Sequence, residues 1–275
     1  MSEDSELEAR LPEQDAFAPP DDFVAQANVS DEAIYERFER DWPDCWEEAA
    51  EMIDWRERWD RVLDDSDAPF YEWFVGGTVN ACENCVDRHV DAGRGEETAI
   101  EWQGELGEER SYTYDELQRE VEAVAAALRD LGVEEDDVVS MYMPMIPELP
   151  IAMLACARIG APHNVVFAGF SADALATRME SADSDYLVTC DGYYRRGEAL
   201  EHKAKADEAL DHLGRDIEAA VVVDRLDGAY DHPMVDHDHD YESVVADHRG
   251  SSVEPVDRDA EDMLFLMYTS GTTGK

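Results

Sequence analysis

The sequence predicts an α/β protein built around a mostly parallel sheet with crossover helices. From about residue 97 onward, short apolar runs alternate with longer segments whose apolar residues recur at helical spacing. This alternation is typical of crossover units, which place successive strands parallel to one another. Some runs, such as Val221-Val222-Val223, are apolar at every position, as expected for strands that are buried on both faces. The hydrophobic content of 44% is sufficient for a substantial core.

The N-terminal residues depart from this pattern. Residues 1–30 are acidic, contain three prolines and show no apolar periodicity, so we expect an acidic flexible tail. Residues 31–90 form a second segment, which holds five of the six tryptophans. A helix is expected to begin near Ser30, because a serine side chain can cap the first turn.

Two tryptophan pairs in this segment are each four residues apart, Trp42 with Trp46 and Trp55 with Trp59. Side chains at this spacing share one face of a helix, so the segment is predicted to be helical. We expect the rings to pack the segment onto a larger domain. A platform that stacks a nucleotide base is the alternative interpretation.

The remaining elements follow from apolar spacing and from start and stop signals. A helix is predicted to begin at Thr113 and to end at Gly132, with one apolar face made of Leu117, Val121, Val124, Leu128 and Leu131. The alternation then predicts strands at 137–143, 164–167, 186–190, 219–223 and 263–268 and helices at 147–160, 171–182 and about 197–212. Ser171 is expected to cap the helix that it precedes.

The charge of the chain is extreme, with 68 acidic and 22 basic residues and a formal net charge of −46. Such self-repulsion is tolerated where concentrated salt screens it, because the Debye length is roughly 3 Å at 1 M. We therefore expect a halophilic protein; an acidic partner surface is the alternative. The charge argues against nucleic acid as a partner, because nucleic-acid binding needs a basic surface.

The setting is expected to be a reducing cytoplasm. The N-terminus is acidic and polar, unlike a signal peptide, and no apolar run has the about 18 residues that a membrane span requires. The five cysteines are odd in number and irregularly spaced, which favours free thiols. Cys82-x-x-Cys85 with nearby His89 could indicate a metal or redox site, but no second ligand pair accompanies it.

Residues 224–260 interrupt the strand–helix rhythm. Four histidines alternate there with aspartates, as a metal cluster would require: His232, His237, His239 and His248. No spacing fixes these ligands on one rigid element, so we expect a solvated acidic loop and no metal site.

The last seven residues, Thr269-Ser270-Gly271-Thr272-Thr273-Gly274-Lys275, follow the apolar run 263–268. Glycines allow backbone N–H groups to approach a polyphosphate, hydroxyls donate hydrogen bonds and the lysine adds positive charge. The spacing is not that of a Walker A motif. The string closely resembles the phosphate-binding loop of the adenylate-forming superfamily, which includes acyl-coenzyme A synthetases, luciferases and peptide-synthetase adenylation domains.

Further blocks resemble the acetyl-coenzyme A synthetase family within that superfamily. They comprise Pro69–Gly77, Met143–Glu148, Met153–His163, Val165–Ser171 and Asp191–Gly197. The resemblance covers roughly residues 30–275. It implies that 31–90 is that family's N-terminal extension and that 91–275 is the first part of the AMP-binding domain, so the chain is expected to be a fragment that ends in the phosphate loop.

The resemblance also implies roles for individual residues. It assigns the ATP phosphates to Thr269, Ser270, Gly271, Thr272, Thr273, Gly274 and Lys275, with Lys275 as the catalytic residue. It assigns coenzyme A to Phe167, Gly169 and Arg195. The adjoining Arg196, Gly197 and Glu198 are counted with this site, Arg196 because a guanidinium can bind two phosphate oxygens. Two positions depart from the family pattern, because Ala168 replaces a usual glycine and Glu198 a usual basic residue.

The activity implied by the resemblance is that of an acetate–CoA ligase. Acetate and ATP, with Mg²⁺, would give acetyl-adenylate and diphosphate, and the coenzyme A thiol would then displace AMP. A propionyl- or other short-chain acyl-CoA ligase is the alternative, and a non-catalytic nucleotide-binding protein is a remote one. The fragment alone is expected to be inactive, and the sequence indicates no oligomeric state.

Overall fold

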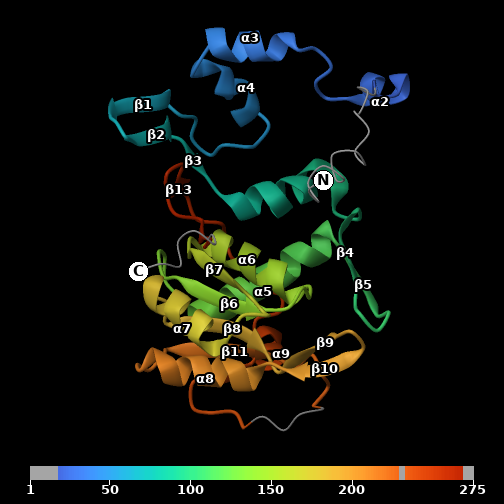
Figure 1. Ribbon diagram of the computed structural model, residues 1–275, viewed down its shortest axis with the longest axis vertical. Coiled ribbons are helices and arrows are strands. Elements are labelled where there is room, and N and C mark those ends of the chain that lie inside the picture. The colour runs from blue at the N-terminus through green and yellow to red at the C-terminus, as the bar shows by residue number, and fades with distance from the viewer. Residues whose placement is uncertain (1–17, 229–232, 269–275) are drawn as a thin grey trace, which may run out of the picture. The chain divides into compact units, whose positions relative to one another are not determined.

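The computed structural model describes residues 18–228 and 233–268 (Figure 1). The chain divides into two compact units, one that ends at Ala50 and one that begins at Glu51. The described part of the first unit contains short helical elements: α2 (Asp21–Gln26), α3 (Ala33–Arg40), a 3₁₀ turn (Asp44–Trp46) and α4 (Glu47–Ala50).

The first helix of the described residues is α2, which lies within the segment expected to be a flexible tail. Helix α3 begins at Ala33, and the predicted cap at Ser30 is wrong. The Asp31 carboxylate instead accepts a hydrogen bond from the Ala33 N–H at 2.9 Å. The N-cap residue of α3 is Glu32, and its side chain makes no capping hydrogen bond.

The tryptophan pairs do not lie on helices, so that prediction is wrong. Pro43 interrupts the first pair, and Trp46 belongs to the 3₁₀ turn. Trp55 and Trp59 lie in an irregular segment of the second unit, where their ring centroids are 4.9 Å apart. Both rings also contact Phe74. Aromatic packing against the strand that carries Phe74, and not helical periodicity, brings these rings together.

The second unit is built on a six-stranded parallel sheet, and the predicted α/β class is confirmed. The strand order is β12-β11-β8-β6-β7-β14, and every neighbouring pair is parallel. The strands are β6 (Val139–Met143), β7 (His163–Phe167), β8 (Tyr186–Cys190), β11 (Ala219–Val223), β12 (Asp238–Asp240) and β14 (Phe265–Leu266). The helices are α5 (Tyr114–Asp130), α6 (Glu148–Ile159), α7 (Ala172–Ser181), α8 (Lys203–Leu213) and α9 (Tyr241–Ala246).

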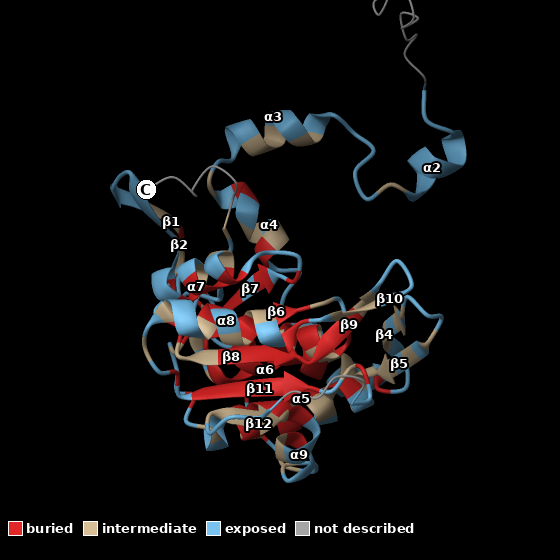
Figure 2. Cartoon of the chain, turned by 60° about the horizontal axis from the view of Figure 1, so that its bottom comes forward, coloured by how far each residue is buried: buried red, intermediate tan, exposed pale blue. Residues whose placement is uncertain are grey.

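Helices cover both faces of this sheet. Alternate residues of a strand point to opposite faces, so Met141 joins the core under α5, α6 and α9, whereas Tyr142 joins the core under α7 and α8. Successive residues of β8 and β11 likewise alternate between the two cores. Strands β6 and β11 are accordingly buried at every residue, and β8 at every residue after Tyr186 (Figure 2). This explains the uninterrupted apolar runs of the sequence.

Several predicted helix boundaries are confirmed by their caps. Thr113 and Glu116 form a reciprocal capping box at the start of α5, and the Ser171 side chain accepts the Ala174 N–H at the start of α7. Gly160 ends α6 with a positive φ of 76°. A Cβ atom at that position would lie 2.9 Å from a methyl carbon of Val256, so a close approach also requires the glycine.

Small antiparallel pairs surround the sheet. They are β1 (Arg61–Asp67) with β2 (Phe70–Val75), β3 (Thr78–Val79) with β13 (Arg258–Asp259), β4 (Thr98–Gln103) with β5 (Glu109–Thr113), and β9 (Gly192–Arg195) with β10 (Glu198–Glu201). The predicted helix at 197–212 is therefore wrong in its first residues. Helix α8 begins only at Lys203, because the preceding residues complete the β9–β10 hairpin.

Within the described part of 224–260, residues 238–246 form a strand and a helix, which corrects the expectation of a solvated loop there. Strand β12 extends the sheet beside β11. The Asp238 side chain is fully buried, and its carboxylate pairs with the buried ammonium of Lys203 at 2.9 Å. In the helix that follows, Tyr241 and Val245 are four residues apart and buried. His232 lies outside the described residues. The polar composition concealed an edge strand whose aspartate has a buried cationic partner.

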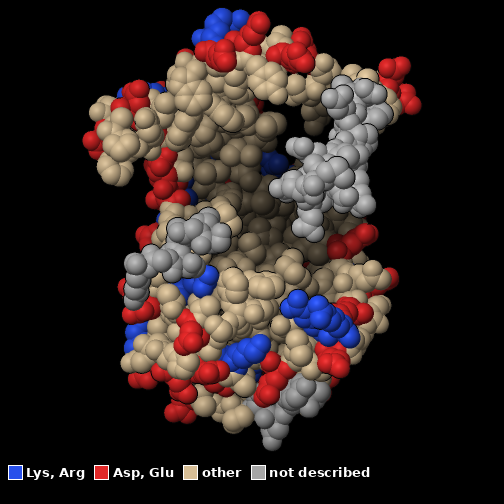
Figure 3. Space-filling model, in the orientation of Figure 1, with Lys and Arg blue, Asp and Glu red and all other residues tan. Residues whose placement is uncertain are grey.

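The acidic side chains are scattered over the visible face of the second unit and do not gather in one patch (Figure 3). Such a distribution matches a general surface adaptation better than a single acidic docking site. Within the described ranges, none of the helices combines the length and apolarity that a membrane span needs.

Candidate functional site

A cavity of about 250 Å³ opens at the carboxyl ends of β6 and β7. In parallel α/β sheets, ligands bind in crevices at this edge. Three of the residues that the sequence assigned to coenzyme A lie in its wall, namely Phe167, Gly169 and Arg195. The other lining residues are Trp102, Gln103, Gly104, Glu105, Pro144, Met145, Ile146, Ala168, Tyr193, Tyr194 and Arg225.

The turn after β7 forms one wall. Phe167 is 60% exposed and packs edge-to-face on Phe170, with ring centroids 5.5 Å apart. Gly169 permits this arrangement, because a Cβ atom there would lie 2.4 Å from the Phe167 ring. The buried Tyr142 anchors the turn by donating its O–H to the Phe170 carbonyl at 2.7 Å. Ala168 is accommodated as a buried residue.

The β9–β10 hairpin carries the predicted arginines. Arg195 ends β9 and lines the cavity, whereas Arg196 and Gly197 form the two-residue turn, with φ angles of 55° and 79°. Two positive φ values are typical of type I′ hairpin turns. Glu198 faces Arg195 across the hairpin. Arg196, Gly197 and Glu198 are not among the lining residues, so the structure brings only part of the predicted set together.

The opposite wall was not predicted from the sequence. Trp102 lies on β4, and its indole N–H donates to the Met145 carbonyl at 2.7 Å. The guanidinium carbons of Arg110 and Arg225 lie 4.8 and 5.4 Å from its ring centroid. Alternating apolar residues on either side of the 104–107 turn were the available signal. The contacts themselves join residues far apart in the sequence and could not be read from it.

The two hairpins meet at the cavity. The Glu105 carboxylate accepts the Gly197 N–H at 2.6 Å, and Arg225 pairs with Glu108 at 2.6 Å. The base of β9 is fixed by Asp191, whose carboxylate accepts three backbone N–H groups. Burial nevertheless raises the pKa of Asp191 above its ordinary value. These contacts hold the cavity wall without using Arg195.

Arg195 has no acidic ion-pair partner among the described residues. Within residues 18–228 and 233–268, no acidic oxygen lies within 4.0 Å of its guanidinium, nor of that of Arg196, whereas Arg110 and Arg225 each have a carboxylate partner. A guanidinium without an acidic partner, at the mouth of a cavity, can bind a phosphate through two parallel hydrogen bonds.

The predicted phosphate loop, 269–275, lies outside the described residues, so its seven assigned residues, including Lys275, remain predictions. The strand before it is shorter than predicted, since only Phe265 and Leu266 pair with β7. Because β14 and β7 are parallel neighbours, the chain leaves both at the same edge of the sheet. Tyr268, the last described residue before the loop, donates its O–H to the backbone carbonyl of Arg178 at 3.3 Å.

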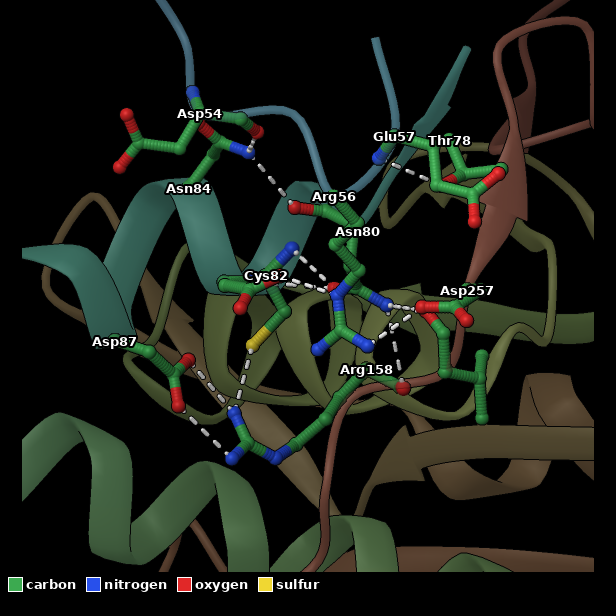
Figure 4. A network of polar contacts seen from close by, with 12 residues as sticks. Asp54, Arg56, Glu57, Thr78, Asn80, Cys82, Asn84, Asp87, Arg158 and Asp257 are labelled. Atoms are coloured by element: carbon green, nitrogen blue, oxygen red, sulfur yellow. Dashed lines mark hydrogen bonds and ion pairs between the residues drawn. The ribbon is translucent and has the colours of Figure 1, made fainter. Parts of the chain in front are cut away.

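Cys82, the first cysteine of the Cys82-x-x-Cys85 motif, belongs to a buried polar network and not to the cavity (Figure 4). Arg158 is buried, and its guanidinium donates to both Asp87 oxygens at 2.8 and 2.9 Å and to Cys82 Sγ at 3.6 Å. Burial raises the pKa of the Cys82 thiol to about 12, so it remains protonated and unreactive at neutral pH. Cys85 is exposed.

Asn80 completes this network. Its amide nitrogen donates to the carbonyls of Ala157 and Val256 at 3.0 and 2.9 Å, and its oxygen accepts the Cys82 N–H at 2.9 Å. The network ties the 51–90 segment to helix α6, which is a structural role. Among the residues that the structure describes, no group of three or more His, Cys, Asp or Glu side chains could hold a metal ion.

The comparisons with known proteins agree with these features. The chain is similar to acetyl-coenzyme A synthetases of Streptomyces coelicolor (47% identity, 100% of this chain and 42% of the relative), Mycolicibacterium smegmatis (47%, 94% and 27%) and Deinococcus radiodurans (46%, 98% and 41%). It therefore spans about two fifths or less of the length of these relatives. Residues 31–85 match the family described as acetyl-coenzyme A synthetase N-terminus. Residues 86–275, well over half of the chain, match the family described as AMP-binding enzyme, and the chain belongs to that family.

Proposed function

We propose that this chain forms the first part of an acetate–CoA ligase. In the complete enzyme, an acetate oxygen attacks the α-phosphorus of ATP and diphosphate leaves, which gives acetyl-adenylate. The thiol of coenzyme A then attacks the acetyl carbon, AMP leaves with its phosphate oxygen, and the thiol proton is released. Residues 31–90 act as the N-terminal extension and 91–275 as the first part of the AMP-binding domain.

One observation carries the coenzyme A part of this proposal. The cavity at the carboxyl ends of β6 and β7 combines the apolar ring of Phe167 with the guanidinium of Arg195. No acidic side chain of the described ranges lies within 4.0 Å of that guanidinium, in a chain with a net charge of −46. An arginine kept clear of carboxylates in such a chain is suited to an anionic ligand. The printed name of the relatives, acetyl-coenzyme A synthetase, supports the same assignment.

We assign the nucleotide part of coenzyme A to this cavity. Arg195 binds a phosphate, and Phe167 and Gly169 form the surface on which the ligand lies. Arg196 and Gly197 present a second guanidinium and a tight turn at the rim. Glu198 lies beside Arg195 in the hairpin and weakens phosphate binding by like-charge repulsion.

The loop 269–275 is proposed to hold the ATP phosphates. Its hydroxyl and amide donors stabilise the negative charge that develops on the departing diphosphate, and Lys275 contributes a positive charge. In other enzymes, loss of one oriented donor to a developing anion costs about 2.7–4 kcal/mol of transition-state stabilisation. Mg²⁺ commonly reaches such sites bound to substrate phosphates, so we propose that it enters with ATP. We also propose a cytoplasmic setting rich in salt.

Acetate-dependent exchange of labelled diphosphate into ATP tests the proposal in the complete enzyme that contains this chain. Exchange requires only the first half-reaction, so coenzyme A is omitted. We expect faster exchange with acetate than with propionate. Faster exchange with propionate would assign the enzyme to longer acyl chains, and no exchange with any short carboxylate would refute the ligase assignment. The 275-residue chain alone should show no exchange above background.

A further inference from the structure

Arg178 lies between two aromatic rings that belong to different substrate regions. It is on α7, and its guanidinium carbon is 4.6 Å from the ring centroid of Phe170 and 5.2 Å from that of Tyr268. Its Nη1 donates to the Ala174 carbonyl at 2.8 Å. Within residues 18–228 and 233–268, no carboxylate oxygen lies within 4.0 Å of this guanidinium. The positive charge therefore faces the two rings without an acidic competitor.

Phe170 connects Arg178 to the cavity at the ends of β6 and β7. It is the last residue of the 167–170 turn, and its ring packs on Phe167, which lines the cavity. Its carbonyl accepts the O–H of the buried Tyr142. Because the backbone of Phe170 is anchored, its ring is the part of the turn that Arg178 can orient.

Tyr268 connects Arg178 to the phosphate loop. It follows β14 and directly precedes residue 269, where the loop begins. Its ring contacts the Arg178 guanidinium and its O–H donates to the Arg178 carbonyl. Two contacts from one residue of α7 therefore fix Tyr268, the last described residue before the loop, relative to α7.

We propose that Arg178 is a positioning residue that couples the coenzyme A site to the ATP site. This inference rests on the proposed function. Arg178 touches neither substrate in this arrangement; it sets the Phe170 ring beside the coenzyme A cavity and the Tyr268 ring at the entrance to the phosphate loop. A ligand that orders one ring also orders the guanidinium, so the other ring is ordered at a smaller entropic cost.

Kinetics of the complete enzyme separate this role from simple packing. In Arg178→Met, the KM for ATP in acetate-dependent exchange and the KM for coenzyme A in thioester formation should both rise about tenfold, because each ring loses the guanidinium contact that orders it. Arg178→Lys should recover most of both losses, because an ammonium group also binds aromatic faces. Arg129→Met, which removes an exposed arginine from helix α5, should leave both constants unchanged.

A change in only one KM, or a fall in kcat alone, would overturn the proposal. If urea unfolding shows that Arg178→Met does not fold, Arg178→Lys and two tyrosine variants still test the positioning role of Arg178. Tyr268→Phe keeps the ring and should change both constants by less than about twofold, whereas Tyr268→Leu should resemble Arg178→Met. Equal effects of the two tyrosine variants would contradict the role of the ring.

A double-mutant cycle measures the coupling itself. Phe170→Leu should raise the KM for ATP, and Tyr268→Leu should raise the KM for coenzyme A. Adding Arg178→Met to either variant should raise that KM by less than a further twofold. Full additivity would show that the rings act independently of Arg178. The proposed function is judged separately, because absent exchange in the wild-type enzyme refutes the ligase, whereas normal exchange with unaffected Arg178 variants refutes only the coupling.

Discussion

Arg158 and Asp87 form a buried ion pair with two parallel hydrogen bonds, although 71 residues separate them in the sequence. The Arg158 side chain is only 2% exposed. Breaking a buried ion pair by removing one partner typically costs about 3–5 kcal/mol. Glu122 Oε1, 3.2 Å from Arg158 Nη2, compensates part of the remaining charge. We therefore expect Asp87→Ala to lower the free energy of unfolding by about 3 kcal/mol, the lower end of that range, in urea denaturation at constant high salt.

The matched control is an exposed pair of the same geometry. Arg249 and Glu242 are also joined by two hydrogen bonds, at 2.5 and 2.9 Å, but the Arg249 side chain is 44% exposed. Glu242→Ala should cost at most about 1 kcal/mol, because water solvates the remaining arginine. Equal costs for the two alanine variants would show that burial does not determine the strength of the Arg158–Asp87 pair.

The sheet and its helices could be predicted because their signals are local. Val221-Val222-Val223 is buried on both faces and reads as an uninterrupted apolar run. Helix α5 carries its own start signal at Thr113 and a stop signal at Gly132. These signals require no knowledge of distant residues, so the alternation of strands and helices follows from the sequence.

The small hairpins and the buried polar contacts could not be predicted in this way. The β9–β10 hairpin interrupts a segment whose composition suits a helix, and Asp238 looks like a solvated residue until its contact with Lys203 is known. In the candidate site, Phe167, Gly169 and Arg195 were found through a family resemblance. Trp102 could not be found, because its partners Met145 and Arg225 come from other elements of the fold.

Arg195 is expected to affect coenzyme A and not adenylate formation. A hydrogen bond to a charged group is worth about 1.5–3 kcal/mol, so Arg195→Ala should raise the KM for coenzyme A by about tenfold to a hundredfold. Acetate-dependent diphosphate exchange should change little. Arg249→Ala, which removes an arginine outside the cavity, should leave both measurements unchanged. An equal loss in the two half-reactions would contradict the assignment of Arg195 to coenzyme A.

Glu198 gives the opposite prediction at the same hairpin. Glu198 is paired with Arg195 across the hairpin, and a surface charge interaction is worth about 0.2–1 kcal/mol. Glu198→Arg should therefore lower the KM for coenzyme A by about twofold to fivefold, and the effect should shrink at higher salt. Glu180→Arg, an exposed charge reversal on α7, controls for the change in net charge. An unchanged KM in Glu198→Arg would place the ligand phosphates away from the hairpin.

Two buried histidines predict a loss of stability in mild acid. Burial lowers the pKa values of His163 and His202 to about 4, and His202 packs on Tyr142 with ring centroids 4.0 Å apart. The unfolded chain binds protons near pH 6.5, so it gains protons first, and stability falls between about pH 6.5 and 4.

From pH 7 to pH 5 each of these histidines should cost about 2 kcal/mol of unfolding free energy. His202→Gln cannot titrate and should flatten the dependence by that amount, as should His163→Gln. The raised pKa of Asp191 acts in the opposite direction, since protonation on acidification relieves a buried charge. This contribution is the same in the wild type and in both histidine variants, so it cancels when their pH dependences are compared. A slope that survives in both variants would exclude the histidines as its cause.

The net charge of −46 predicts that the fold depends on salt. Charges repel over about 10 Å at 0.1 M salt but over only about 3 Å at 1 M, and the acids are spread over the visible surface (Figure 3). The melting temperature should therefore fall steadily as KCl is reduced from 2 M to 0.1 M. Replacing Glu180, Glu208 and Asp211, which are exposed on α7 and α8, with lysine should flatten this dependence. Sucrose supplies the control, because it favours compact states without screening charge. If sucrose restored the melting temperature as fully as KCl does, or if the lysine variant kept the wild-type salt dependence, surface self-repulsion would not be the cause of that dependence.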